Sequence, residues 1–215
     1  MNYLAHLWLA QHNTGSRVGN LLGDFCRGVD LTAQPPTVLA GLYNHRAVDW
    51  FTDRADEVRQ ARQLFSAPMR RFAPVALDLL FDHLLIRHWA EWNQSAFSAY
   101  KTQLYCQLQQ DLPQMPTGMA VVMQKVLQQD WFGSYATLQG VQHAIRALAL
   151  RGQRTGIYAA IADELPQLQP QIQPLFLHFL PQLQHFVVQA AIEQNPAQAK
   201  ARYISATGKD QSSEA

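Results

Sequence analysis

The sequence predicts an all-α protein that folds as a single helical domain. Apolar residues recur at helical spacing along most of the chain, and no segment shows the sustained alternation that is typical of a strand. No internal repeat or linker divides the chain. With 215 residues, 48% of them hydrophobic, it is long enough to bury a substantial core. We place the domain at residues 1–202 and expect a flexible polar tail at residues 203–215.

Proline, serine and threonine mark the expected helix starts, because these residues suit the first turn or the cap. The starts that we expect lie at or just after Pro36, Ser66, Pro74, Ser95, Thr117 and Thr137. The first of these helices should end near Asp53, and Pro74 should lead into the long apolar segment at residues 75–92. Beyond Arg154, proline recurs among glutamine and leucine, which predicts helices broken into short pieces.

The charge is balanced overall but unevenly distributed. A formal net charge of +1 argues against a general nucleic-acid binder, which would be clearly basic. Nine of the thirteen arginines lie between Arg17 and Arg87, whereas residues 103–194 are rich in glutamine and leucine and carry few charges. The first half is therefore the basic part of the chain and the place to look for chemistry.

Cysteine use and hydropathy predict a cytoplasmic protein. Cys26 and Cys106 lie far apart and form neither a metal motif nor a disulfide framework, so we interpret both as reduced thiols. The apolar start at residues 1–15 lacks the basic region and cleavage site of a signal peptide. We find no uninterrupted run of eighteen apolar residues and expect no membrane span.

Residues of metal-ligand type recur in pairs in the first half of the chain. Side chains four residues apart share one face of a helix. The pairs with that spacing are Asn2 with His6, Asn20 with Asp24, His45 with Asp49, and Asp78 with Asp82, and His83 adjoins the last of them. Histidine and carboxylate ligands suit a divalent ion such as Mn²⁺, Mg²⁺, Fe²⁺ or Zn²⁺, and several helices can direct them to one buried point.

Two interpretations of these residues stay open. The histidines could be ordinary core or surface residues, and Asp49 could merely pair with Arg46 on a solvated face. Asp24 and Asp82, however, lie among leucine and phenylalanine, where a carboxylate is rarely left unless it is paired or bound to metal. The sequence has no phosphate-binding loop, dinucleotide fingerprint, serine nucleophile elbow or HExxH motif that would indicate another chemistry.

Four segments together resemble the acyl carrier protein phosphodiesterase family, also called ACP hydrolyase. They are NYLAHLWLA, GNLLGDFCRG, HRAVDWFTD followed by VRQAR, and FDHLLIRHW. Their order and spacing match the family over about residues 1–92, with a weaker and mainly helical correspondence in the remaining chain. Any one segment alone would be a weak signal, but the four in succession are specific.

The resemblance implies a bacterial enzyme that hydrolyses holo-acyl carrier protein to the apo form and 4'-phosphopantetheine with a divalent metal, typically manganese. It also implies a helical fold like that of the HD-domain phosphohydrolases, from which the family diverges. This chain has no adjacent His-Asp pair, only the reversed Asp82-His83. Carrier proteins are acidic, so a basic docking surface is expected. The docking candidates are Arg54, Arg59, Arg62, Arg70 and Arg71.

These considerations yield two sets of candidate site residues. The expected metal ligands are His6, Asp24, His45, Asp82 and His83. The expected catalytic residues are Asp24, Arg46, Asp49, His83 and His88. A metal-bound water would attack phosphorus, an imidazole would help the serine oxygen to leave, and an arginine would hold the phosphate.

Two other functions compete with this one. A small-molecule phosphohydrolase of the HD type would share the metal site but act on nucleotides without a carrier protein. A non-catalytic helical interaction module would use the same polar residues as bridges between helices and would bind no metal.

Overall fold

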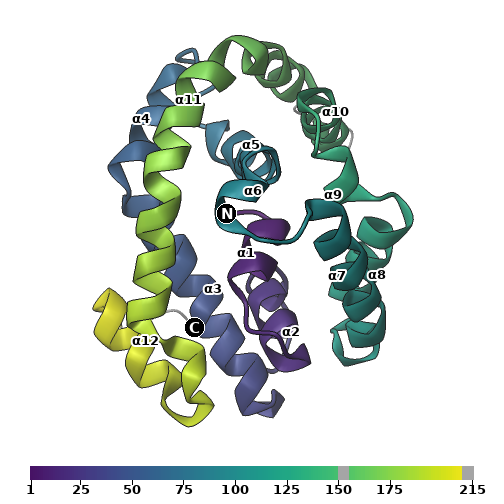
Figure 1. Ribbon diagram of the computed structural model, residues 1–215, viewed down its shortest axis with the longest axis vertical. Coiled ribbons are helices and arrows are strands. Elements are labelled where there is room, and N and C mark those ends of the chain that lie inside the picture. Colours follow the sequence, from purple (N-terminus) through teal and green to yellow (C-terminus); the bar gives the residue numbers. More distant parts are fainter. Residues whose placement is uncertain (150–154, 210–215) are drawn as a thin grey trace.

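The computed structural model describes residues 1–149 and 155–209, and every regular element within these ranges is helical (Figure 1). The all-α prediction is confirmed. The α-helices are α1 (Tyr3–Leu9), α2 (Thr14–Leu22), α3 (Pro36–Arg54), α4 (Asp56–Leu64), α5 (Ala73–Arg87), α6 (Trp89–Trp92), α7 (Phe97–Asp111), α8 (Thr117–Gln128), α9 (Trp131–Ser134), α10 (Leu138–Ala149), α11 (Thr155–Ala190) and α12 (Ala199–Thr207). Short 3₁₀ turns η1 (Gly23–Phe25), η2 (Leu31–Ala33), η3 (Leu112–Gln114), η4 (Ile192–Gln194) and η5 (Pro196–Gln198) connect some of them.

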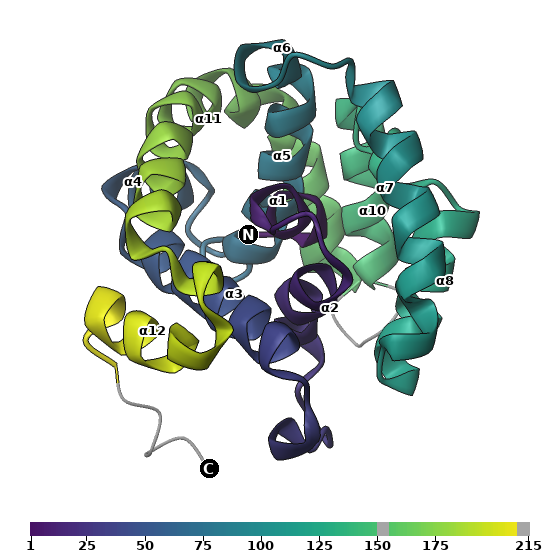
Figure 2. The same ribbon diagram turned by 60° about the horizontal axis from the view of Figure 1, so that its bottom comes forward.

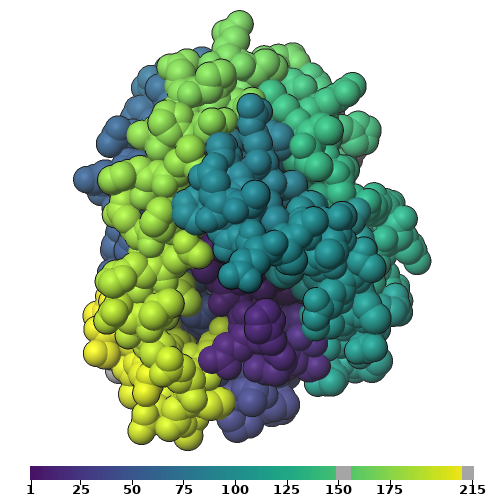
Figure 3. Space-filling view, viewed as in Figure 1, coloured from purple at the N-terminus to yellow at the C-terminus, as the bar shows by residue number. Residues whose placement is uncertain are grey.

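Helices α1 and α5 lie at the centre of the molecule, with α3, α4 and α11 on one side and α7, α8 and α10 on the other (Figures 1 and 2). The fully buried Leu4 of α1 and the buried Leu80, Phe81 and Leu84 of α5 belong to the same hydrophobic core. On the face shown in Figure 3, the N-terminal helices are visible between α11 and the segment around α7. The chain thus wraps its later helices around its first one.

Most of the expected helix starts are confirmed. Helix α3 begins at Pro36 and α5 carries Pro74 in its first turn, where a missing N–H costs no hydrogen bond. Helix α8 begins at Thr117. The apolar segment 75–92 is not one helix, because α5 ends at Arg87 and the short α6 follows.

The prediction of broken helices beyond Arg154 is wrong, because α11 is continuous from Thr155 to Ala190. Its four internal prolines are exposed and recur at intervals that keep them on one outer face: Pro166, Pro170, Pro174 and Pro181. The carbonyl that Pro166 leaves without a helical partner, that of Ala162, accepts a hydrogen bond of 2.7 Å from Gln142 Nε2. The opposite face buries Phe176, Phe179 and other core residues, and this packing outweighs the local cost of the prolines.

By length and composition, the segment Gly156–Gln194 is long and apolar enough to cross a membrane. A single helix of this kind is weak evidence for a membrane span. In this structure α11 packs against α10, α4, α3 and α5.

The C-terminal segment is ordered beyond the predicted domain boundary. Helix α12 runs to Thr207, and the ring of Tyr203 is buried against Ala40 and Ala47 of α3. The flexible tail predicted from residue 203 is therefore corrected for residues 203–207, where burial on one helix face outweighs the polar composition. Residues 210–215 of that tail lie outside the described part of the chain.

Glycine allows α2 and α3 to cross in close contact. A Cβ atom on Gly19 would lie 2.1 Å from the Val38 carbonyl oxygen, and one on Gly41 would lie 2.6 Å from that of Ser16. These separations are far below van der Waals contact, so only glycine fits at either position. The crossing brings the polar residues Asn20 and His45 of the two helices together.

Replacing Pro170 by alanine tests whether α11 is one helix. If it is, the substitution restores a backbone N–H in a helix interior and should raise the free energy of unfolding by about 1–3 kcal/mol. Pro36→Ala is the matched control, since proline is favoured at the first position of a helix and its loss should leave stability unchanged or slightly lower. Thermal unfolding followed by circular dichroism measures both. Equal effects of the two substitutions would contradict a continuous α11.

Candidate metal centre

Two histidines and one aspartate converge where α1 packs beside α3. His6 of α1 and His45 and Asp49 of α3 offer ligand atoms that all lie within 4.8 Å of one another. Asp49 Oδ1 is 3.2 Å from His6 Nε2, and Asp49 Oδ2 is 3.0 Å from His45 Nε2. The two imidazole rings stack with their centroids 3.9 Å apart. The spacing of His45 and Asp49 in the sequence predicted their shared face, and the structure adds His6 to it.

Asp82 holds the first helix in place. Its buried carboxylate accepts hydrogen bonds from the backbone N–H groups of Leu4 (3.3 Å) and Ala5 (3.0 Å) and from Asn2 Nδ2 (2.8 Å). These groups belong to the free N-terminal end of α1, where unpaired N–H donors need acceptors. Burial raises the pKa of Asp82 to about 7, and the three hydrogen bonds oppose that rise. Asp82 thus positions α1, and the structure does not bring it into the group around Asp49.

A backbone hydrogen bond and a glycine orient His45. The Asn20 carbonyl lies 2.7 Å from His45 Nδ1, and because a carbonyl only accepts, Nδ1 carries the proton and Nε2 is free to bind a cation. Histidine ligands in metal sites commonly have such a partner on the other ring nitrogen. The ring lies against Gly23, where a Cβ atom would come within 2.0 Å of it. Gly23 therefore leaves the space that the imidazole occupies.

Burial and mutual contact set the charges of the three residues. Burial, aided by the nearby His45, lowers the pKa of His6 to about 3, so its imidazole is neutral at physiological pH. For His45 burial also acts to lower the pKa, but Asp49 outweighs it and the net shift is upward. Burial acts to raise the pKa of Asp49, yet the contacts with the two histidines hold it well below its usual range. The group combines a carboxylate with imidazoles.

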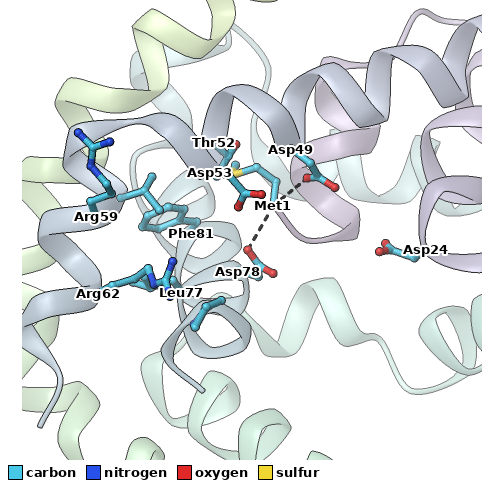
Figure 4. A pocket seen from close by; sticks show the side chains of 12 residues that line it. Met1, Asp24, Asp49, Thr52, Asp53, Arg59, Arg62, Leu77, Asp78 and Phe81 are labelled. Carbon is cyan, nitrogen blue, oxygen red and sulfur yellow. Dashed lines mark hydrogen bonds and ion pairs between the residues drawn. The ribbon is translucent and has the colours of Figure 1, made fainter. Parts of the chain in front are cut away.

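An acidic cavity of about 170 Å³ adjoins this group (Figure 4). Asp24, Asp49, Asp53 and Asp78 line it, and Arg59 and Arg62 of α4 stand at its other end. The α-amino group of Met1 lies 3.3 Å from Asp49 Oδ1 and 3.2 Å from Asp78 Oδ1, so these two carboxylates converge on one cationic group. Burial raises the pKa of Asp24 and of Asp78. We call this space the acidic cavity.

The donor set fits a divalent metal ion. Both ring nitrogens of His6 are buried; Nδ1 has no hydrogen-bond partner, and Nε2 has only Asp49 Oδ1, 3.2 Å away. A buried imidazole without a partner is costly unless something else binds it. Two imidazole nitrogens and a carboxylate oxygen suit Mn²⁺, Fe²⁺ or Zn²⁺, and further carboxylates are available nearby.

The remaining predicted site residues lie in different surroundings. Asp24 lines the acidic cavity near His45 but does not belong to the group of three. His83 Nδ1 donates to the Tyr135 carbonyl at 2.7 Å, and His88 Nδ1 lies 2.6 Å from Glu91 Oε1. The guanidinium carbon of Arg46 lies over the ring of Tyr43, 6.0 Å from its centroid. The structure therefore does not bring His83 or His88 to the group of His6, His45 and Asp49.

Sequence reasoning missed the buried Glu193 of η4. Its Oε1 accepts a hydrogen bond of 3.0 Å from Asn20 Nδ2, across 173 residues of sequence. Asn44 Nδ2 donates to Asn20 Oδ1 at 3.0 Å, so the Asn20 side chain is held from two sides while its backbone carbonyl orients His45. No local pattern marks Glu193, because its partner lies in the first helices. Glu193 thus contacts Asn20, whose backbone carbonyl contacts His45 of the candidate metal centre.

The fold and the site together define an all-helical protein with a histidine–carboxylate centre of metal-binding type beside an acidic cavity. Comparison with known proteins identifies the family within this class. A family model described as acyl carrier protein phosphodiesterase matches residues 1–183. Relatives named acyl carrier protein phosphodiesterase from Salmonella dublin, Salmonella newport and Salmonella enteritidis are each 34% identical over 184 residues, which is 85% of this chain and 95% of the relative. No solved structure matches the chain.

The chain therefore belongs to the acyl carrier protein phosphodiesterase family. The family predicted from the four sequence segments is confirmed, and the match extends well beyond residue 92, where those segments end. Glu193 and α12 lie after the matched region.

Replacing Gly23 by alanine should disrupt the metal centre. The new methyl group would overlap the His45 ring, so the imidazole must move away from Asp49. We expect Mn²⁺ affinity, measured by isothermal titration calorimetry, to fall by about tenfold or more. Gly118→Ala is the control, because a Cβ atom there would meet nothing within 4 Å. Equal Mn²⁺ affinity of the two variants would argue against His45 as a ligand.

Glu193 offers a test of the positioning contact through Asn20. Glu193→Ala removes the acceptor of Asn20 Nδ2 and should weaken Mn²⁺ binding by about tenfold, as loss of outer partners does in other metal sites. Glu193→Gln keeps an oxygen at the same distance and should retain most of the affinity. Calorimetry compares them with Glu164→Gln, a half-buried residue that accepts a hydrogen bond from Ser66 away from the site. If Glu193→Ala bound Mn²⁺ as tightly as the unaltered protein, Glu193 would have no positioning role.

Proposed function

We propose that this protein is a metal-dependent phosphodiesterase that hydrolyses holo-acyl carrier protein to apo-acyl carrier protein and 4'-phosphopantetheine. Membership of the acyl carrier protein phosphodiesterase family supports the reaction and the protein substrate. The convergence of His6, His45 and Asp49 beside an acidic cavity is the observation that carries the proposal. We further propose Mn²⁺ as the metal and the cytoplasm as the location.

His6, His45 and Asp49 would hold the metal ion. When bound there, the ion would lower the pKa of a water molecule and neutralise charge on a phosphate oxygen. The chain's own residues supply the rest. The Asn20 carbonyl keeps His45 in the tautomer that presents Nε2, and the low pKa of His6 keeps its imidazole neutral.

Asp24 is the proposed proton acceptor. It lines the acidic cavity, and burial raises the pKa of its carboxyl group, which brings it closer to the value that suits a general base. Attack of water on phosphorus forms one P–O bond and breaks the bond to the serine oxygen, so one proton must leave the water and one must reach the serine. Asp24 takes the proton from the attacking water, and the protonated carboxyl group then passes it through solvent water to the serine oxygen. The serine side chain remains on the carrier protein and the phosphate leaves with pantetheine.

Arginines at the mouth of the acidic cavity are suited to phosphate and to an acidic protein. Arg59 and Arg62 line the cavity and are exposed, so their guanidinium groups can reach phosphate oxygens. Arg54, Arg70 and Arg71 are also exposed and lie before and after α4 in the sequence. We propose that these five residues form the docking surface for the carrier protein.

The direct test is incubation of the protein with holo-acyl carrier protein and Mn²⁺, followed by intact-mass measurement. We expect the carrier protein to lose the mass of 4'-phosphopantetheine. Asp49→Asn, which keeps the size of the side chain but removes its charge, should abolish the release and lower bound Mn²⁺ while the circular dichroism spectrum stays helical. Turnover of nucleotides with an unchanged carrier protein would instead favour a small-molecule phosphohydrolase, and absence of both metal binding and turnover would favour an interaction module.

If these arginines form the docking surface, substitutions at its edge should weaken binding of the carrier protein without slowing the chemical step. Reversing Arg70 and Arg71 to glutamate should raise KM for holo-acyl carrier protein and leave kcat nearly unchanged, because binding common to the ground and transition states is lost. Reversing Arg59 and Arg62 should raise KM and also lower kcat, since these two line the cavity. Arg146→Glu, on α10, is the control. Steady-state kinetics at low salt decide: an unchanged KM in both double variants would place docking elsewhere.

A further inference from the structure

A second, larger cavity lies between the central helices α1 and α5 and the helices α8, α9 and α10. It has a volume of about 770 Å³. Tyr3, Val75, Leu79, Val122, Trp131 and Ala147 contribute its apolar wall. We call this space the apolar cavity.

The apolar cavity adjoins the acidic cavity at Asp78, which lines both. Asp78 lies one helical turn before Asp82 on α5, and Tyr3 begins the helix that carries His6. The rings of Tyr3 and Phe25 stack 6.0 Å apart beside this junction, next in sequence to Asp24. An extended ligand with one end near the candidate metal centre could therefore place its other end in the apolar cavity, beside Asp78.

The two cavities differ in size and charge in a way that suits a two-part ligand. At about 170 Å³ the acidic cavity is below the roughly 300–1,000 Å³ typical of small-molecule sites, so it has room for an ion and a phosphoryl group but not for a long organic arm. The apolar cavity falls within that range. Among the described residues that line it, Asp78 is the only carboxylate, and it stands at the junction.

We propose that the apolar cavity binds the uncharged pantetheine arm of the prosthetic group while the phosphate lies in the acidic cavity. This inference rests on the proposed function and adds a specific site for the part of the substrate that does not react. The arm is an uncharged chain of methylene and methyl groups with two amides, one hydroxyl group and a terminal thiol. Three polar side chains stand among the apolar residues of this cavity. Asn2 donates through Nδ2 to Asp82, Gln129 accepts through Oε1 from Trp131, and Ser134 donates to the Trp131 carbonyl, so the Asn2 oxygen, the Gln129 amide nitrogen and the Ser134 oxygen are the atoms suited to pair with those amides.

A third cavity offers the main alternative place for the arm. It has a volume of about 740 Å³ and meets the acidic cavity at Asp24, but it is more polar and more open, with Arg27, Gln34 and Gln114 in its wall. An uncharged, partly aliphatic chain gains more from the apolar cavity, because burial of apolar surface is favourable and enclosure removes more of it from water. We call this third space the polar cavity. Its polar and open wall better suits contact with the surface of the carrier protein.

The test measures binding of pantetheine itself by isothermal titration calorimetry to the full chain. Ala147→Phe fills the apolar cavity from α10, and Val122→Phe fills it from α8 on the opposite wall. We expect each to weaken pantetheine binding by about tenfold or more, the scale on which a steric mismatch in a pocket acts. Gly118→Leu fills the polar cavity instead and, since a Cβ atom there meets nothing within 4 Å, should bind as the unaltered protein does.

Kinetics separate failure of this inference from failure of the proposed function. With holo-acyl carrier protein, Ala147→Phe should raise KM, whereas hydrolysis of bis(p-nitrophenyl) phosphate, which has no such arm, should be unchanged. If the unaltered protein releases 4'-phosphopantetheine but both phenylalanine variants bind pantetheine normally, the apolar cavity is not the arm site and the function stands. If the unaltered protein binds pantetheine, both phenylalanine variants fail to bind it, and no 4'-phosphopantetheine is released from the carrier protein, the cavity assignment stands and the proposed function fails. Loss of binding in Gly118→Leu alone would move the arm to the polar cavity.

Discussion

The site depends on one buried contact, the carboxylate of Asp82 at the free end of α1. Three N–H groups converge on it, and each such hydrogen bond contributes about 0.5–1.5 kcal/mol when the acceptor is neutral and about 1.5–3 kcal/mol when it is ionised. The contact joins residues 77–80 positions apart in the sequence and fixes where the first helix starts. His6 follows one residue after the last bonded N–H, so its position beside Asp49 is a consequence of that anchor.

Close backbone packing positions His45, which belongs to the α3 half of the candidate metal centre. The crossing of α2 and α3 at Gly19 and Gly41 brings the Asn20 carbonyl against the His45 ring, and Gly23 leaves room for that ring. Glu193 then holds the Asn20 side chain from a segment that follows the family match at residues 1–183. The C-terminal helix α12 packs on α3 through Tyr203, so the end of the chain supports the helix that carries His45 and Asp49.

Local rules in the sequence predicted the features that depend on neighbours along the chain. Proline at a helix start predicted α3, and the interval of four residues predicted that His45 and Asp49 share a face. The rules failed where distant residues decide. The prolines of α11 stay within one helix because its other face is buried, and Asp82, which the sequence marked as a ligand, is engaged by the backbone of α1 instead. Glu193 left no local signal, since its partner is 173 residues away.

The central claim is that His6, His45 and Asp49 form one metal centre. Anomalous X-ray diffraction from a crystal grown with Mn²⁺, recorded at the manganese absorption edge, tests it most directly because it locates the ion without reference to activity. The account predicts a peak within bonding distance, about 2.0–2.2 Å, of an imidazole nitrogen of both histidines and of an Asp49 oxygen, as for first-row metals with these ligands. A peak beside Asp82 and His83, with none between His6 and His45, would contradict it.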